Sequence, residues 1–75
     1  MTTLDQLKVG SLVAIEQVVG SDAIAMRLME MGLTPGTEVK IIGEAPLGDP
    51  VELEVRGYRL SVRRSEAKRI EVSPG

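Results

Sequence analysis

The stretch from Ser21 to Thr37, SDAIAMRLMEMGLTPGT, constrains the fold most, because it encodes the start of a helix, its stop and the turn that follows. The side-chain oxygen of Ser21 or Asp22 can accept a hydrogen bond from a free amide of the first helical turn. Gly32 can take the left-handed conformation that closes a helix, and the next residue, Leu33, can then pack back on the last turn. Pro35-Gly36 has the residue types of a type II turn. We therefore expect one short helix that leads through a turn into a strand.

The pattern of the rest of the chain predicts short strands. VELEV at 51–55 and YRLSV at 58–62 alternate apolar with polar residues, and only Arg56-Gly57 separates them. A two-residue turn would place Leu53 opposite Leu60, and we expect both to be buried. Strands are also expected at 11–19, 37–44 and 68–72, before a frayed tail at 73–75. About five short antiparallel strands avoid open edges best as a barrel, so we predict an all-β barrel with one helix inserted between strands one and two.

Two apolar rows are expected on the helix. Ile24, Leu28 and Met31 recur at the spacing i, i+4, i+7, which predicts that they face the core. Met26 and Met29 lie three residues apart and form a second row. Flexible methionines suit a docking surface, so we predict that Met26 and Met29 contact a partner. The alternative is that these two side chains plug the end of the barrel.

Length and composition exclude several classes of function. A chain of 75 residues is expected to form a single domain, 1–75, with a marginal core. It contains no His and no Cys, and therefore no imidazole base, no thiol nucleophile and none of the usual nitrogen and sulfur ligands of zinc. We predict a protein that is not an enzyme and has no catalytic, cofactor or metal site. The N-terminal MTTLDQLKVG lacks the pattern of a signal peptide, and no apolar run is long enough to span a membrane, so we expect a soluble cytoplasmic protein.

The charges are unevenly distributed along the chain. Residues 1–55 carry three basic residues against nine acidic ones, whereas residues 56–75 carry six basic residues against two acidic ones. Single-stranded nucleic acid is bound by stacking on aromatic rings, and Tyr58 is the only aromatic residue, so we expect no direct nucleic-acid binding. We predict instead that Arg59 and Arg63, on the predicted hairpin, help to bind a partner. Leu47, at a loop tip, is expected to extend the contact row of Met26 and Met29. The alternative is a solvated face on which the arginines lie opposite glutamates.

Four segments of the chain resemble the ferrous iron transport protein A family, FeoA. They are LKVGSLVAI at 7–15, RLMEMGLTPGTEVKI at 27–41, LGDPVELEVRGYRLSVR at 47–63 and SEAKRIEV at 65–72. The resemblance implies a small SH3-like barrel that acts in the cytoplasm as a non-catalytic accessory of FeoB, the membrane permease for ferrous iron. Contact with the membrane would then occur only through that partner.

The same resemblance leaves an alternative function open. A similar SH3-like domain closes some iron-dependent repressors, which implies a regulatory domain that binds a transition metal or is linked to nucleic acid. This chain shows no winged-helix portion, which favours the transport accessory. Because it offers no His or Cys, we assign no metal ligands.

Overall fold

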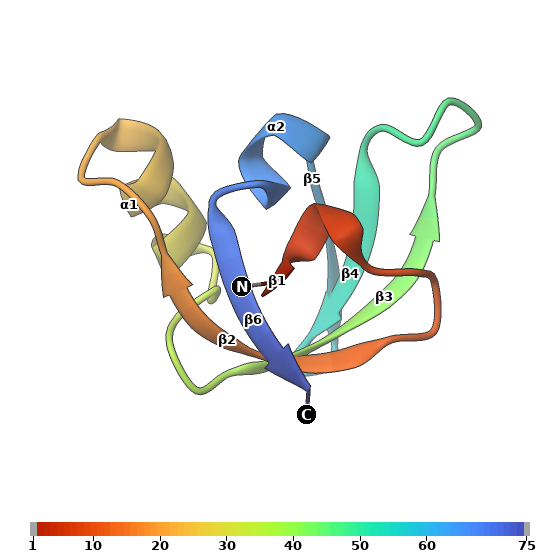
Figure 1. Ribbon diagram of the computed structural model, residues 1–75, viewed down its shortest axis with the longest axis horizontal. Helices are drawn as coiled ribbons and strands as arrows, with labels where there is room; N and C mark the ends of the chain where they lie inside the picture. Colours follow the sequence, from red (N-terminus) through yellow and green to blue (C-terminus); the bar gives the residue numbers. More distant parts are fainter. Residues whose placement is uncertain (1, 75) are drawn as a thin grey trace.

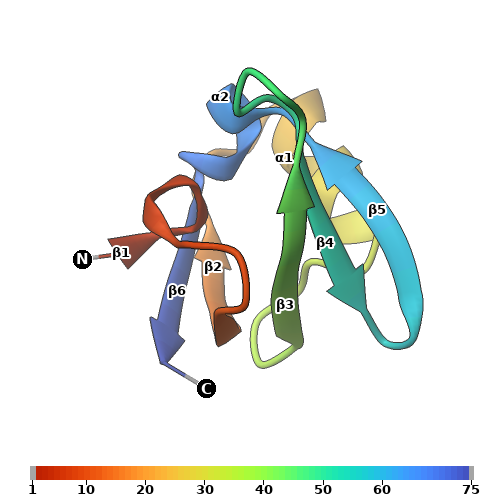
Figure 2. The same ribbon diagram turned by 90° about the vertical axis from the view of Figure 1, so that its right-hand side faces the viewer.

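Six antiparallel strands form one sheet in the computed structural model, which describes residues 2–74 (Figure 1). The order across the sheet is β1-β6-β2-β3-β4-β5. The strands are β1 (Thr2–Thr3), β2 (Leu12–Val18), β3 (Glu38–Glu44), β4 (Val51–Val55), β5 (Tyr58–Val62) and β6 (Ile70–Pro74). The helical segments are the 3₁₀ turn η1 (Leu4–Gln6), α1 (Ala23–Glu30) and the single turn α2 (Arg64–Ala67). Figures 1 and 2 show that the sheet curls into an open barrel, with α1 inserted between β2 and β3 in the chain.

The predicted barrel with one inserted helix is confirmed, with two corrections. The sheet has six strands in the described residues rather than five, because Thr2 and Thr3 pair with β6. Two residues carry no recognisable alternation, so β1 could not be predicted from the sequence. The last strand also runs on to Pro74, paired with Val13 of β2, where a frayed tail was expected. Gly75 lies outside the described residues.

The β4–β5 hairpin has the predicted register. Val55 pairs with Tyr58, and Leu53 pairs with Leu60. Arg56 and Gly57 both have positive φ, +50° and +84°, as a type I′ turn requires. Leu53 is fully buried, but Leu60 is only half-buried, so the prediction that both are buried is wrong for Leu60. The reason is position: β5 is the last strand of the sheet, and no strand of residues 2–74 covers its outer edge.

The predicted boundaries of α1 are confirmed. The carboxylate of Asp22 accepts a hydrogen bond from the Ala25 amide at 3.1 Å. Gly32 has φ +104° and ends the helix, and the Leu33 amide donates to the Leu28 carbonyl at 3.2 Å, as in a Schellman motif. The predicted reversing turn follows, with the Thr37 amide donating to the carbonyl of Thr34 at 3.1 Å.

The buried face of α1 differs from the predicted one. Leu28 is fully buried and the half-buried Met31 packs against the core, as predicted, but Ile24 is 41% exposed and Ala25 is fully buried instead. Because α1 has only eight residues and lies over one end of the barrel, a narrow strip of it reaches the core (Figure 1). The small side chain of Ala25 permits a close approach there, and the bulkier Ile24 is left on the flank.

An aliphatic core fills the barrel, as its composition predicts. The residues that contribute to it are Leu4, Val13, Ile15, Leu28, Leu33, Val39, Ile41, Val51, Leu53, Val55, Val62, Ala67, Ile70 and Val72. Register shifts interrupt β2 between Ile15 and Gln17 and β3 between Ile41 and Gly43. Such bulges increase local twist and bend, which helps a sheet of this size to curl around its core.

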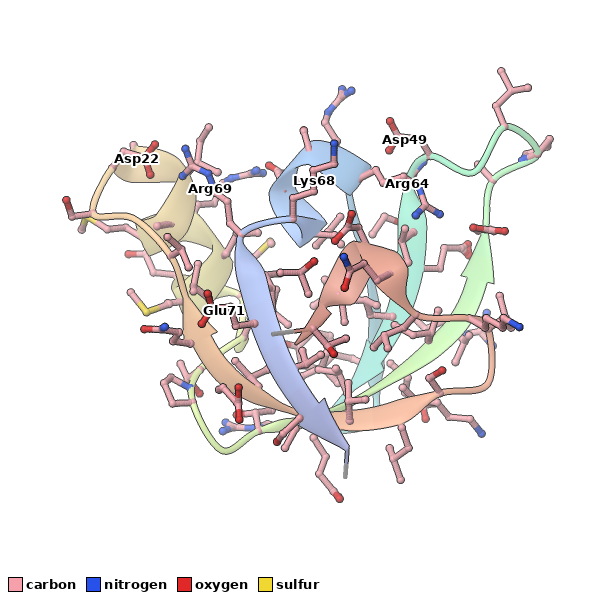
Figure 3. The ribbon with its side chains drawn as sticks, in the orientation of Figure 1. Asp22, Asp49, Arg64, Lys68, Arg69 and Glu71 are labelled. Atoms are coloured by element: carbon pink, nitrogen blue, oxygen red, sulfur yellow. The ribbon has the colours of Figure 1, made fainter. Side chains whose placement is uncertain are left out.

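Arg64 ties three segments together at one end of the barrel. Its guanidinium donates to the carbonyl of Asp5 at 2.7 Å, to the carbonyl of Gly48 at 2.6 Å and to the carboxylate of Glu44 at 2.7 Å. Its backbone amide donates to the carboxylate of Asp49 at 2.9 Å, and both residues are labelled in Figure 3. Arg64 therefore joins η1, the end of β3 and the β3–β4 loop to α2. Its guanidinium and backbone amide are used in hydrogen bonds within the fold.

Candidate partner-binding surfaces

Met26 and Met29 lie on the surface of α1. Their side chains are 56% and 37% exposed, whereas Met31 packs against the core. On the other flank of the helix, Arg27 contacts the carboxylate of Glu66 in α2. The methionine row therefore forms an apolar surface at the end of the barrel, on the flank that does not face α2.

Leu47 does not extend the methionine row. It lies at the tip of the loop between β3 and β4 and is 96% exposed. Figure 1 shows this loop and α1 on opposite sides of α2. The structure therefore leaves Leu47 as an isolated apolar tip, and a partner would have to reach across α2 to contact it together with Met26 and Met29.

Arg59 and Arg63 are both exposed at the β5 edge of the sheet. Arg59 lies opposite Glu54 in the predicted register. However, the ion pairs among residues 2–74 are Arg27–Glu66, Arg64–Glu44 and Arg69–Asp22, and none of them involves Arg59 or Arg63. These two guanidinium groups therefore have no carboxylate within ion-pair distance in the part of the chain that the structure describes.

Arg27 and Glu66 form a link that sequence reasoning missed. Glu66 is only 9% exposed, and its carboxylate accepts hydrogen bonds from the Arg27 guanidinium and, at 3.0 Å, from the Arg63 amide. A cavity of about 300 Å³ lies beside this link and is lined by Arg27, Asp49, Pro50, Ser61, Arg63 and Glu66. The available signal was the position of Glu66 three residues after Arg63, where a glutamate can cap the start of a helical turn.

The ion pair between Asp22 and Arg69 has a structural role. A guanidinium nitrogen of Arg69 lies 2.6 Å from the carboxylate of Asp22, and Figure 3 labels both residues. This hydrogen bond, with that from the Ala25 amide, lowers the pKa of Asp22 to about 2. The pair joins the first turn of α1 to the residue that precedes β6.

The described residues contain neither a cluster of metal-ligand side chains nor a helix suited to crossing a membrane. Within residues 2–74, no three Asp or Glu side chains converge as metal ligands would, and the chain has no His or Cys. No helix in the same residues has the length and apolar character to cross a membrane. An open groove of about 600 Å³ includes Glu38, Lys40, Glu54 and Arg56 in its lining, and this mixture of charges selects no class of ligand.

Comparison with known proteins identifies the family. Residues 2–74 match the FeoA domain family. The chain is 36% identical over 69 residues to an Fe(2+) transport protein A/Fe(2+) transporter FeoB fusion protein of Porphyromonas gingivalis. That alignment covers 92% of this chain but only 8% of the fusion protein, so the similarity is confined to a small part of the relative.

Solved structures agree in fold. An FeoA-like protein from Clostridium acetobutylicum is 42% identical with a TM-score of 0.88, covering 99% of this chain and 90% of that one. FeoA from Stenotrophomonas maltophilia, solved as a zinc complex and described as a prokaryotic SH3 domain protein, is 36% identical with a TM-score of 0.85, covering 97% and 91%. The predicted SH3-like barrel is thereby confirmed, and the chain belongs to the FeoA family.

Proposed function

We propose that this chain is a non-catalytic accessory domain of ferrous iron uptake that binds a FeoB-type permease at the cytoplasmic face of the membrane. The observation that carries the proposal is the relative from Porphyromonas gingivalis, whose name gives it both an Fe(2+) transport protein A part and a FeoB part in one chain. Fusion holds two domains at a high effective concentration, which favours their association without any new contact.

The surface of the domain supports binding rather than chemistry on iron. The chain has no His or Cys, and its described carboxylates are spread among ion pairs and strand faces. Hydrated ferrous ion would find no preformed cage of nitrogen, sulfur or grouped oxygen ligands there. Iron would therefore pass through the permease, and this domain would act on the permease.

Met26 and Met29 are the proposed apolar contacts with the permease, and Leu47, Arg59 and Arg63 are the proposed outlying contacts. The two methionines are exposed on a helix whose two ends are fixed by capping hydrogen bonds. Methionine side chains adapt to an irregular partner surface and make favourable dispersion contacts.

Co-purification with the cognate permease in detergent tests the proposal. The parent chain is expected to co-elute, and the double variant Met26→Glu/Met29→Glu is expected to lose binding while its circular dichroism spectrum stays unchanged. Val9→Glu is the matched control, because Val9 is also about half exposed, at 54%, but precedes β2. Equal binding by the double variant and the parent would refute the role of the methionines, and failure of the parent to bind would refute the proposed function.

A second function has one observation in its favour, the zinc complex of the relative from Stenotrophomonas maltophilia. This second function is that of a regulatory domain that binds a transition metal, the alternative that the resemblance leaves open. The donor set of this chain does not fit zinc, since it contains neither His nor Cys. Anaerobic calorimetry of the isolated chain with ferrous ion and with zinc distinguishes the two functions: saturable binding with one metal per chain would favour the regulatory domain over the accessory.

A further inference from the structure

The outer edge of β5 has unpaired backbone groups. In a hairpin closed by a two-residue type I′ turn, the residues flanking the turn form a hydrogen-bonded pair, and such pairs then alternate along the strands. Val55–Tyr58 is that first pair, so Leu53–Leu60 is the next. The N–H and C=O groups of Arg59 and Ser61 therefore point away from β4. Within residues 2–74, no hydrogen bond engages these groups.

Hydrogen bonds to other segments mark both ends of the stretch of β5 that has this open edge. At the start of β5, the Tyr58 hydroxyl donates a hydrogen bond to the carbonyl of Met31, just after α1. Beyond the end of β5, the Arg63 amide donates to the carboxylate of Glu66 at 3.0 Å. Residues 59–61 remain between these links, a length of about 10 Å at the usual rise of a strand. Figure 2 shows β5 at the outer side of the sheet, with no strand beyond it.

The side chains around this edge are basic. Arg59 and Ser61 are exposed and lie on one face of β5, and the exposed Arg63 directly follows the strand. Arg27, whose side chain is 54% exposed, reaches from α1 to the cavity that Ser61 and Arg63 also line. The nearby acids have other partners or face away. Glu66 is paired with Arg27, and Asp49, which lines the same cavity, accepts a hydrogen bond from the Arg64 amide. Glu52 and Glu54 lie on β4 and so on the side of β5 away from the open edge.

We propose that this edge binds, by strand addition, a short extended segment of a partner protein that carries Asp or Glu at alternate positions. Its backbone would pair with Arg59 and Ser61, and main-chain bonds of this kind supply affinity while alternate side chains supply specificity. Residues directly opposite each other on adjacent strands interact, so acidic side chains would lie beside Arg59 and Arg63. The identity of the partner as the permease rests on the proposed function, whereas the chemistry of the segment does not.

The primary experiment is an NMR titration of the ¹⁵N-labelled chain with the peptide acetyl-Thr-Glu-Val-Glu-Thr-amide. We expect saturable shifts of the amide resonances of residues 59–61, and no such shifts with the matched peptide in which Lys replaces Glu. Overlapping 12-residue peptides from the soluble parts of the cognate permease then locate a natural segment. Shifts confined to α1, or no shifts with any acidic peptide, would overturn the proposal.

Backbone pairing is tested on both partners. Ser61→Pro removes an outward N–H without removing a ladder bond, which an edge strand tolerates. It is expected to weaken binding at least tenfold, whereas Ser61→Ala, which keeps the N–H, should bind as the parent does. N-methylation of the peptide at successive amides leaves the protein unchanged. It therefore tests backbone pairing even if Ser61→Pro does not fold. Loss of binding at alternate amides is expected, and uniform tolerance would overturn strand addition.

The charges are tested by Arg59→Glu/Arg63→Glu, with Lys68→Glu as control. The double variant should bind the acidic peptide at least tenfold more weakly and with less dependence on salt, and the control should bind like the parent. If the double variant loses binding of the acidic peptide while Ser61→Pro binds it normally, the peptide is held by charge alone and not by strand addition. Stronger shifts of residues 59–61 with a thymidine oligonucleotide would show a nucleic-acid surface. Each of these two outcomes overturns the proposal.

The peptide and permease experiments can fail independently. If the permease binds the parent chain but acidic peptides do not, the proposed function stands and strand addition at β5 is refuted. If acidic peptides bind at residues 59–61 but the permease does not bind, strand addition stands and the proposed function is refuted.

Discussion

Replacing Gly32 with alanine should destabilise the fold by two separable effects. Gly32 ends α1 with φ +104°, a conformation that a residue with a side chain rarely adopts. A Cβ at this position would also lie 2.7 Å from the Tyr58 hydroxyl oxygen, which is closer than such atoms normally approach. Tyr58 is 45% exposed and can move away, but it would then give up its hydrogen bond to the carbonyl of Met31.

The magnitude follows from these two contributions. A non-glycine residue in a sparsely populated backbone region costs about 1–3 kcal/mol. Loss of one hydrogen bond such as that of Tyr58 costs about 0.5–1.5 kcal/mol. We therefore expect Gly32→Ala to lower the free energy of unfolding by about 2–4 kcal/mol, a large fraction of the ~5–15 kcal/mol that a domain typically has. For a chain of this size, the melting temperature should fall by roughly 10–25 °C.

Two comparisons separate the effects. Gly36 has φ +89°, and nothing lies within 4 Å of a Cβ built there, so Gly36→Ala should report backbone strain alone. Tyr58→Phe removes the hydroxyl, so Gly32→Ala should cost less in that background by about the hydrogen-bond contribution. Urea unfolding followed by circular dichroism measures all four variants. Equal losses for Gly32→Ala and Gly36→Ala, or no relief from Tyr58→Phe, would refute the role assigned to the hydroxyl.

Three further predictions concern the core, an ion pair and the Arg64 links. Leu53→Ala should lower the free energy of unfolding by about 2–5 kcal/mol, because Leu53 is fully buried; a loss below ~1 kcal/mol in urea unfolding would contradict its place in the core. Arg69 holds the pKa of Asp22 at about 2, below its ordinary 3.8, so the stabilisation is present above pH ~4 and is lost as pH falls toward 2. Asp22→Asn should flatten the melting temperature against pH in that window, and an unchanged slope would contradict the assignment. Arg64→Met should speed amide hydrogen exchange in residues 44–49, because the Arg64 guanidinium donates hydrogen bonds to Gly48 and Glu44, and Lys68→Met serves as the control that should not.

Local rules predicted the parts of the fold that local residues decide. The ends of α1 depend on Asp22 and Gly32, which act within a few residues of themselves, and both operate as predicted. The β4–β5 register follows from a two-residue turn and the alternation on either side of it. In these places turn chemistry and apolar pattern specify the same structure. A sequence predicts its structure well where such local and long-range preferences agree.

The buried face of α1 was mispredicted because it depends on packing at a distance. Leu28 and Met31 face the core as predicted, but Ile24 is exposed and Ala25 is buried, so the buried strip is turned toward Ala25. A helix of eight residues can be rotated by its neighbours without breaking any local rule. The Arg27–Glu66 contact joins α1 to α2 between residues 39 apart in the chain, and neither segment alone specifies that the other is its partner.

The candidate surfaces show the same division between local and distant causes. That Arg59 and Arg63 point outward follows from alternation, and both are exposed as expected. That the edge beside them is open follows from the order of strands, which ends at β5, and from the links of Tyr58 and Glu66, which stop short of residues 59–61. A row of arginines opposite glutamates on a hairpin predicts a solvated, self-paired face. The same row on the last strand of a sheet, without ion pairs of its own among the described residues, is instead a place where another chain can add both its backbone and its charge.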